Sequence, residues 1–145
     1  MIHPDTEVRR CRGDFGYGIF ATAPIPKGTI TFAKDPLDID ISPAMYDLLS
    51  HSSRAHVEKY SYLEASGNRV LSWDTAKYVN HSCEANSLST GWGFEIAIRH
   101  IKAGEELTDD YGLFNMSSGL SCLCQAPSCR GLIHAADAHS FSHSP

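Results

Sequence analysis

The side chains best suited to chemistry in this chain fall in two short segments. The first, "VNHSCEAN" at residues 79–86, carries two amides, an imidazole, a hydroxyl and a thiol. The second, "CLCQAPSC" at residues 122–129, carries three of the five cysteines. Side chains this polar are rarely gathered in a core. Each segment is therefore either a turn that satisfies its own backbone or part of a binding site.

The second segment predicts a structural metal site through the spacing C-x-C-x4-C of Cys122, Cys124 and Cys129. Zinc in such sites takes four ligands in a tetrahedron, so the three local thiolates need a fourth ligand from elsewhere. Cys83 is the best candidate, and Cys11 and His134 are alternatives. Three free thiols in a flexible tail are the alternative to a metal. A shell of four thiolates leaves no open position, so the metal would clamp the tail and do no chemistry.

The elements that must position these segments are short. Residues 16–36 read as strands broken by Gly and Pro, and residues 94–101, "FEIAIRHI", alternate as a strand does. Strands at 60–66 and 68–74 are expected to meet at a turn, and 102–112 to form a turn and a strand. Ser42 and Pro43 predict the start of a helix over 43–58, either continuous or broken. The pattern indicates a mainly β domain.

Length and charge limit the class of protein. The 145 residues suit one domain, and the net charge of −5 argues against a nucleic-acid binder. We expect no membrane span and no signal peptide, because long apolar runs are lacking. Without a signal peptide, we expect an intracellular, cytoplasmic location, or a nuclear one in a eukaryote or a host cell. An odd number of cysteines in such a compartment favours thiols or metal ligands over disulfides.

Five sequence blocks together resemble those of SET-domain protein lysine methyltransferases with a post-SET zinc segment. They are "GYG" at 16–18, "IFATAPIPKG" at 19–28, "YVNHSCEAN" at 78–86, "GEELTDDYG" at 104–112 and "CLCQAPSCRG" at 122–131. Their order and spacing match the family over about residues 8–133. The resemblance implies small twisted sheets with a knot-like crossing and one or two short helices. It also implies a SET domain at 1–119, a post-SET zinc segment at 120–133 and a flexible tail at 134–145.

The resemblance also assigns residues to the cofactor, S-adenosylmethionine. In the family the G-x-G backbone lies against the methionine part of the cofactor, and the Asn-His pair holds its amino-acid and adenine ends. The final segment folds over the adenine. The positions in this chain that match are Gly16, Tyr17, Gly18, Asn80, His81 and Leu132.

Catalysis in the family uses the tyrosine of the D-Y-G block, which is Tyr111 here. A second channel tyrosine would be Tyr62, which fits the family's Tyr-Leu better than Tyr60 does. The chain departs from the usual pattern after "KG", where Phe32 and Lys34 stand in place of a Tyr and a Glu. The placement of the substrate is therefore less firmly implied than the binding of the cofactor.

The activity implied is transfer of a methyl group from S-adenosylmethionine to a lysine of a basic, histone-like protein, leaving S-adenosylhomocysteine. The partners would be a protein or peptide, with no direct nucleic acid and no membrane, and the protein would be a monomer or a homodimer. One alternative is a SET-fold, zinc-stabilised interaction module without turnover. Another is a thiol hydrolase that uses Cys83 with His81, although residues two apart seldom place a base and a nucleophile well.

Overall fold

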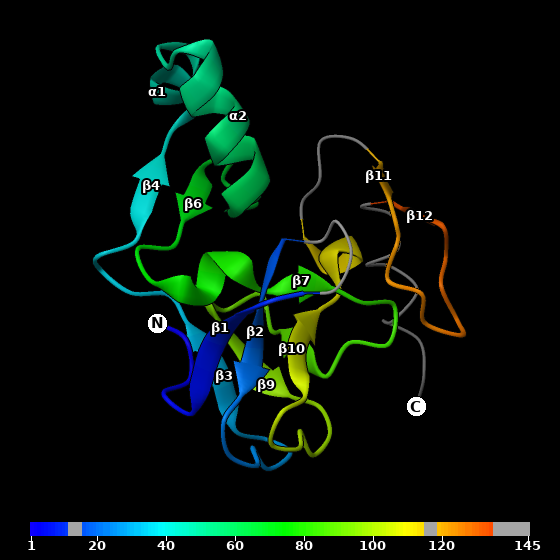
Figure 1. Ribbon diagram of the computed structural model, residues 1–145. Helices are drawn as coiled ribbons and strands as arrows, with labels where there is room; N and C mark the ends of the chain where they lie inside the picture. Colours follow the sequence, from blue (N-terminus) through cyan, green and yellow to red (C-terminus); the bar gives the residue numbers. More distant parts are fainter. Residues whose placement is uncertain (12–15, 115–118, 135–145) are drawn as a thin grey trace.

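The computed structural model describes residues 1–11, 16–114 and 119–134, and it shows several small sheets in place of one large one (Figure 1). The largest sheet has the order β1-β2-β10-β7. Two three-stranded sheets have the orders β3-β9-β8 and β4-β6-β5, and β11 pairs with β12. The strands are β1 (Thr6–Arg10), β2 (Tyr17–Ala21), β3 (Ile30–Ala33), β4 (Ile39–Ile41), β5 (Ser61–Leu63), β6 (Arg69–Leu71), β7 (Asn80–His81), β8 (Ser87–Ser89), β9 (Phe94–Ala97), β10 (Glu106–Asp109), β11 (Leu120–Ser121) and β12 (Leu132–Ile133).

The core lies where the inward faces of β2, β9 and β10 meet. Alternate residues of a strand point to the same face, and Ile19 and Ala21 of β2 are both fully buried. They pack in one apolar cluster with Ala97 of β9 and Leu107 of β10. Ile25 and Ile101 complete this cluster and join through an isolated bridge. The strand predicted at 94–101 is confirmed, although it ends at Ala97.

The helical part, residues 43–60, stands apart from this core, at the top of Figure 1. It packs on the sheet of β4, β5 and β6. Ser42 caps α1 (Pro43–Asp47) by accepting a hydrogen bond from the Met45 amide, and Pro43 occupies the first turn. The broken alternative is confirmed, because a second cap, Ser50, begins α2 (His51–Tyr60). The described residues also form the 3-10 turns η2 (Thr75–Tyr78) and η3 (Tyr111–Leu113).

A crossing of distant segments joins the first polar segment to the strand before the predicted catalytic tyrosine. β7 and β10 run parallel, and Asn80 and His81 stand opposite Thr108 and Asp109. The hairpin of β11 and β12 lies beside this crossing, at the right of Figure 1. The mainly β fold with short helices is thus confirmed. In the part of the chain described, no helix has the length and apolar character needed to cross a membrane.

Candidate cofactor, catalytic and metal sites

Asn80 ties β7 to the glycine-rich segment. Its amide nitrogen donates to the Tyr17 carbonyl at 3.0 Å and to the Glu106 carboxylate at 2.8 Å. Gly16 has a φ of +77°, a conformation that favours glycine. Tyr17 and Gly18 therefore lie against Asn80, and Gly16 immediately precedes them.

Gly18 is the position at which this packing leaves no room for a side chain. A Cβ there would come within 2.7 Å of the Cys11 sulfur and 3.0 Å of the Asn80 amide nitrogen, and closer still to the Glu106 carboxylate. Burial and the charge of Glu106 raise the pKa of Cys11 to about 11, so this thiol stays protonated at neutral pH. Cys11 was predicted only as an alternative metal ligand, and neither it nor Glu106 was expected beside Gly18, because these contacts depend on the pairing of β2 with β1 and with β10.

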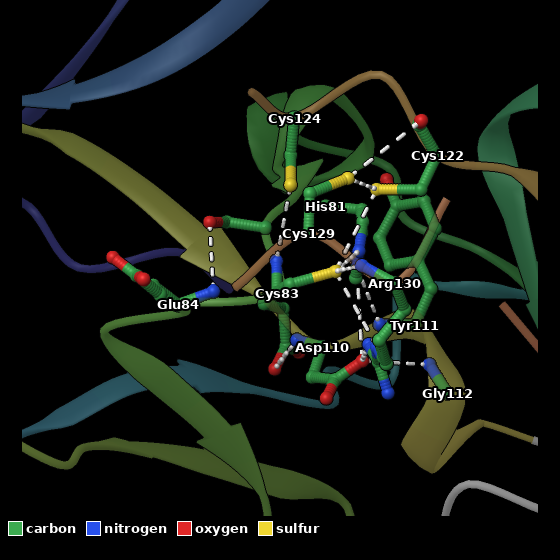
Figure 2. A network of polar contacts seen from close by, with 12 residues as sticks. His81, Cys83, Glu84, Asp110, Tyr111, Gly112, Cys122, Cys124, Cys129 and Arg130 are labelled. Carbon is green, nitrogen blue, oxygen red and sulfur yellow. Dashed lines mark hydrogen bonds and ion pairs between the residues drawn. The ribbon is translucent and has the colours of Figure 1, made fainter. Parts of the chain in front are cut away.

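His81 connects the crossing to Tyr111. Its Nδ1 accepts a hydrogen bond from the Tyr111 amide at 3.1 Å and lies 3.7 Å from the Asp110 carboxylate, which is paired with Arg130 (Figure 2). Burial lowers the pKa of His81 despite the carboxylate of Asp110, which raises it. A neutral imidazole that accepts at Nδ1 carries its proton on Nε2. The ring is therefore held in one orientation at the wall of the site.

Three of the predicted metal ligands gather at the same crossing. The sulfurs of Cys83, Cys122 and Cys124 and a ring nitrogen of His81 all lie within 4.8 Å of one another. Figure 2 shows these sulfurs converging from the β7 loop and from the C-terminal segment. The sulfur of Cys83 lies 3.7 Å from that of Cys122, which in turn lies 3.6 Å from that of Cys129. A tetrahedron with Zn–S bonds near ~2.3 Å has sulfurs about 3.8 Å apart, so these separations fit a shared ion.

The surroundings of the cluster suit thiolates. The Arg130 backbone amide and its Nε donate to the Cys83 sulfur at 3.3 and 3.4 Å, and the Cys83 amide donates to Cys124 at 3.5 Å. The alternative ligands lie elsewhere: the Cys11 sulfur contacts Asn80 and Glu106, and His134 lies beside Gly119.

The thiol-hydrolase alternative is changed by the geometry. The Cys83 sulfur lies 3.4 Å from His81 Nε2, so the expectation that residues two apart would be badly placed does not hold. That sulfur is also within reach of Cys122 and receives two donors from Arg130. A thiol surrounded in this way is suited to hold an ion. A substrate could reach the Cys83 sulfur only if the cluster opened.

Two cavities meet at Tyr111. The smaller, of about 200 Å³, is lined by Asn80, His81, Tyr111 and the C-terminal segment, including Ile133. The larger, of about 540 Å³, is lined by an aromatic group that consists of Phe32, Tyr60, Tyr62, Tyr111 and Phe114. Tyr111 and Leu120 line both. Leu132, predicted to cover the cofactor, is 45% exposed, whereas its neighbour Ile133 is fully buried.

The hydroxyl of Tyr111 points toward the backbone of the crossing and donates to the Val79 carbonyl at 2.6 Å. Burial, followed by the charges of Asp109 and Glu95, raises the pKa of Tyr111, so it is a phenol at any physiological pH. The ring of Tyr62 reaches the same wall through Phe114, with centroids 5.8 Å apart. The two tyrosines predicted to line a channel therefore line one cavity.

Comparison with known proteins agrees with this arrangement. The SET domain family model matches residues 16–112, and the chain belongs to that family. It is 33% identical over 147 residues to the histone-lysine N-methyltransferase ash1 of Drosophila melanogaster, and 32% identical over 139 residues to the histone H3-lysine(4) N-trimethyltransferase ATX1 of Arabidopsis thaliana. These alignments cover 91% and 87% of this chain but only 6% and 13% of those relatives.

A likeness to a solved structure extends to the fold. The crystal structure of KRYPTONITE in complex with mCHG DNA and SAH is similar with a TM-score of 0.62 and 21% identity. The match covers 89% of this chain and 29% of that one. It supports the SET fold that the small sheets and the β7–β10 crossing define.

Proposed function

We propose that this chain transfers a methyl group from S-adenosylmethionine to a lysine side chain of a basic protein such as a histone. The observation that carries the proposal is the pair of cavities that share Tyr111. One is walled by the Asn-His pair, and the other is an aromatic cavity that suits an aliphatic lysine stem. Family membership and relatives named histone-lysine methyltransferases point the same way.

The residues of the chain would act mainly by holding the reactants in line. Asn80 and His81 line the smaller cavity and would bind the methyl donor there. Gly16, Tyr17 and Gly18 would bind it from beside Asn80. The donor supplies an electrophilic methyl group on a sulfonium. Tyr111 and Tyr62 would orient the amine from the larger one, with the phenol oxygen of Tyr111 beside the polarised methyl. Correct alignment alone can contribute ~7–11 kcal/mol to such a reaction.

The sulfur cluster would hold a structural Zn²⁺ through Cys83, Cys122, Cys124 and Cys129. The sulfur separations and the Arg130 donors fit that donor set. The ion would fix residues 120–133 against the crossing and so close one wall of the smaller cavity. Leu132 would then cover the donor together with Ile133, and residues 1–119 would form the SET domain proper. The tail beyond residue 134 lies outside the described residues.

The substrate is proposed to be protein rather than nucleic acid, bound by a monomer or a homodimer inside the cell. The net charge of −5 favours a basic partner and disfavours direct contact with phosphates. Because relatives are named for histones, a chromatin protein is the first substrate to try.

The test is transfer of a radiolabelled methyl group onto purified histones and whole-cell lysate. Wild type should label a protein band, and Tyr111→Phe should label it at least about 100-fold more slowly, because the positioned hydroxyl is lost. Tyr46→Phe is the matched control, since its hydroxyl contacts Glu58 on the helical part.

Equal labelling by wild type and Tyr111→Phe would show that Tyr111 is not the catalytic tyrosine. Binding of S-adenosylhomocysteine without labelling of any lysine-rich substrate would favour the interaction module instead.

A further inference from the structure

Two acidic residues line the aromatic cavity at positions that the strand pattern reserves for apolar side chains. In β10, Leu107 and Asp109 alternate toward the core, and both are buried. In β9, Glu95 stands two residues before the buried Ala97, and it is paired across the sheet with Phe32. Glu95, Phe32 and Asp109 all line the larger cavity. A carboxyl group in a core position is costly unless it is paired, so its presence here calls for a functional reason.

Asp109 is the most deeply buried charged residue of this lining, with 1% of its surface exposed. Its Oδ1 accepts the Asp110 amide at 2.9 Å. Its Oδ2 is buried, and among the described residues no nitrogen or hydroxyl donor reaches it, so only the Glu95 carboxyl group, when protonated, can be a further donor to Asp109. Burial, followed by the charge of Asp109, raises the pKa of Glu95 well above its usual value, whereas that of Asp109 rises to about 6. Asp109 is therefore mainly ionised at neutral pH, and Glu95 holds its proton more tightly than an exposed glutamate does.

We propose, on the basis of the function proposed above, that Asp109 and Glu95 bind the ammonium group of the substrate lysine and accept one of its protons. An ammonium at the inner end of the cavity would give the Asp109 carboxylate a charged donor in addition to the Glu95 carboxyl group. Two other groups of the described lining could take a proton. Glu58 accepts the Tyr46 hydroxyl on the helical part, and Tyr111 is a phenol whose own proton bonds the Val79 carbonyl.

The cations of the same lining do not contradict this assignment, because each lies against an aromatic ring. Lys59 Nζ lies 5.2 Å from the Tyr60 ring centroid and Lys77 Nζ lies 5.7 Å from that of Tyr78. The third cation, Arg69, lies 5.4 Å from the Tyr46 ring on the helical part. The groups that face the acid pair itself are the Ser87 hydroxyl, the Ser89 amide, the Asp110 carboxylate, the phenols of Tyr62 and Tyr111 and the N-terminal ammonium.

The proton step balances without another reactant. The lysine ammonium gives one proton to the Asp109 carboxylate, which leaves a neutral amine with a free electron pair. That pair forms the new N–C bond to the methyl group as the C–S bond breaks, and the bond's electrons stay on sulfur. The product is a methylammonium and a neutral thioether, and the proton on Asp109 leaves to water before the next turnover.

The experiment compares wild type, Asp109→Asn and Glu95→Gln, with Asp47→Asn on the exposed end of α1 as the control. Asparagine and glutamine keep the shape of each acid and remove its charge. Affinity for S-adenosylhomocysteine, measured by calorimetry, should be the same in all four proteins. NMR of 13C-labelled carboxyl groups should show n-butylammonium binding in wild type and no effect of n-butanol. This binding should weaken by about tenfold or more in Asp109→Asn, as for a lost charge-assisted hydrogen bond.

The pH dependence of methyl transfer gives the second readout. Wild type should lose rate as the pH falls below about 6 and be flat above it. In Asp109→Asn the rate at neutral pH should fall by at least about 100-fold. It should then climb about tenfold per pH unit toward the free lysine pKa of about 10.4. A wild-type rate and profile in both variants, or unchanged n-butylammonium binding in Asp109→Asn, would overturn the proposal. Ammonium binding through the pair without labelling of any protein would support this site and count against the function proposed above.

Discussion

At the scale of the residue, Asn86 shows how a motif mixes structural and functional side chains. Asn86 is 1% exposed; its amide donates to the Glu106 carbonyl at 2.8 Å and its oxygen accepts the Thr108 amide at 3.0 Å. We expect Asn86→Ala to lower the free energy of unfolding by about 2–3 kcal/mol, because buried backbone groups lose their partners. Urea unfolding measures this. Asn68→Ala, in the turn before β6, should change it by about 0.5 kcal/mol or less. A variant as stable as wild type would show that water replaces the amide.

The predicted glycines also differ in what they require. Gly18→Ala should cost about 1–3 kcal/mol through overpacking and should weaken the binding of S-adenosylhomocysteine, because Cys11, Asn80 and Glu106 must move. Gly91 has a φ of +77° with open space around it. Gly91→Ala should therefore cost about 1 kcal/mol from backbone strain alone and leave that affinity unchanged. Calorimetry and urea unfolding separate the two effects. Equal affinities in both variants would mean that the crowding at Gly18 is not transmitted to the cofactor site.

Single residues mark the limit of what the sequence could predict. The types and spacing of Cys122, Cys124 and Cys129 were enough to predict a cluster, because a metal site needs only a few ligands and three of them lie close together in the sequence. The acid pair was missed, because Glu95 and Asp109 look like ordinary charged positions in alternating strands. Their burial depends on which face each strand turns to the core, and the pairing of β3 with β9 and of β10 with β2 and β7 decides that.

At the scale of the element, local signals were read correctly and non-local ones were not. Ser42 and Pro43 begin α1 as predicted, because capping involves only neighbouring residues. The strands of two or three residues, such as β7 and β11, carry no period that a pattern could reveal. Their partners come from distant parts of the chain. The crossing of β7 and β10 was therefore expected only from the family resemblance.

The C-terminal segment gives the prediction at this scale. If a bound ion ties residues 120–133 to the crossing, a chelator should release about one zinc per chain, as in other structural sites. Hydrogen exchange of the β11 and β12 amides should then speed up, while the amides of β2 and β10 stay protected, because their packing is independent of the cluster.

Cysteine variants locate the ligands. Cys124→Ser should reproduce the effect of the chelator, whereas Cys11→Ser should retain the metal, because that sulfur lies beside Asn80 and Glu106. Full metal content in Cys124→Ser would exclude Cys124 as a ligand. If the metal content falls in His81→Ala and persists in Cys129→Ser, the fourth ligand is His81 and not Cys129. A His81 ring nitrogen lies within 4.8 Å of the other three sulfurs.

At the scale of the whole molecule, the acid pair connects the site to the stability of the fold. The folded-state pKa of Asp109 is raised to about 6, above about 3.9 for an unfolded aspartate. Between these two pKa values the folded protein therefore binds more protons than the unfolded chain. The contribution of Asp109 to the unfolding free energy is fully present below pH ~4 and is lost as the pH rises through ~6. Asn cannot titrate, so relative to wild type Asp109→Asn should gain about 1.4 kcal/mol in unfolding free energy between pH 5 and pH 8.

Urea unfolding at the two pH values measures that difference, and contributions of the cysteines cancel because both proteins share them. Asp47→Asn should run parallel to wild type, since Asp47 is exposed. Parallel curves for Asp109→Asn would mean that Asp109 titrates normally and is not desolvated in the folded protein. Carboxyl groups whose pKa is strongly raised by burial are concentrated at functional sites. The same substitution should therefore make the molecule more stable and less active, a combination that a purely structural carboxylate would not give.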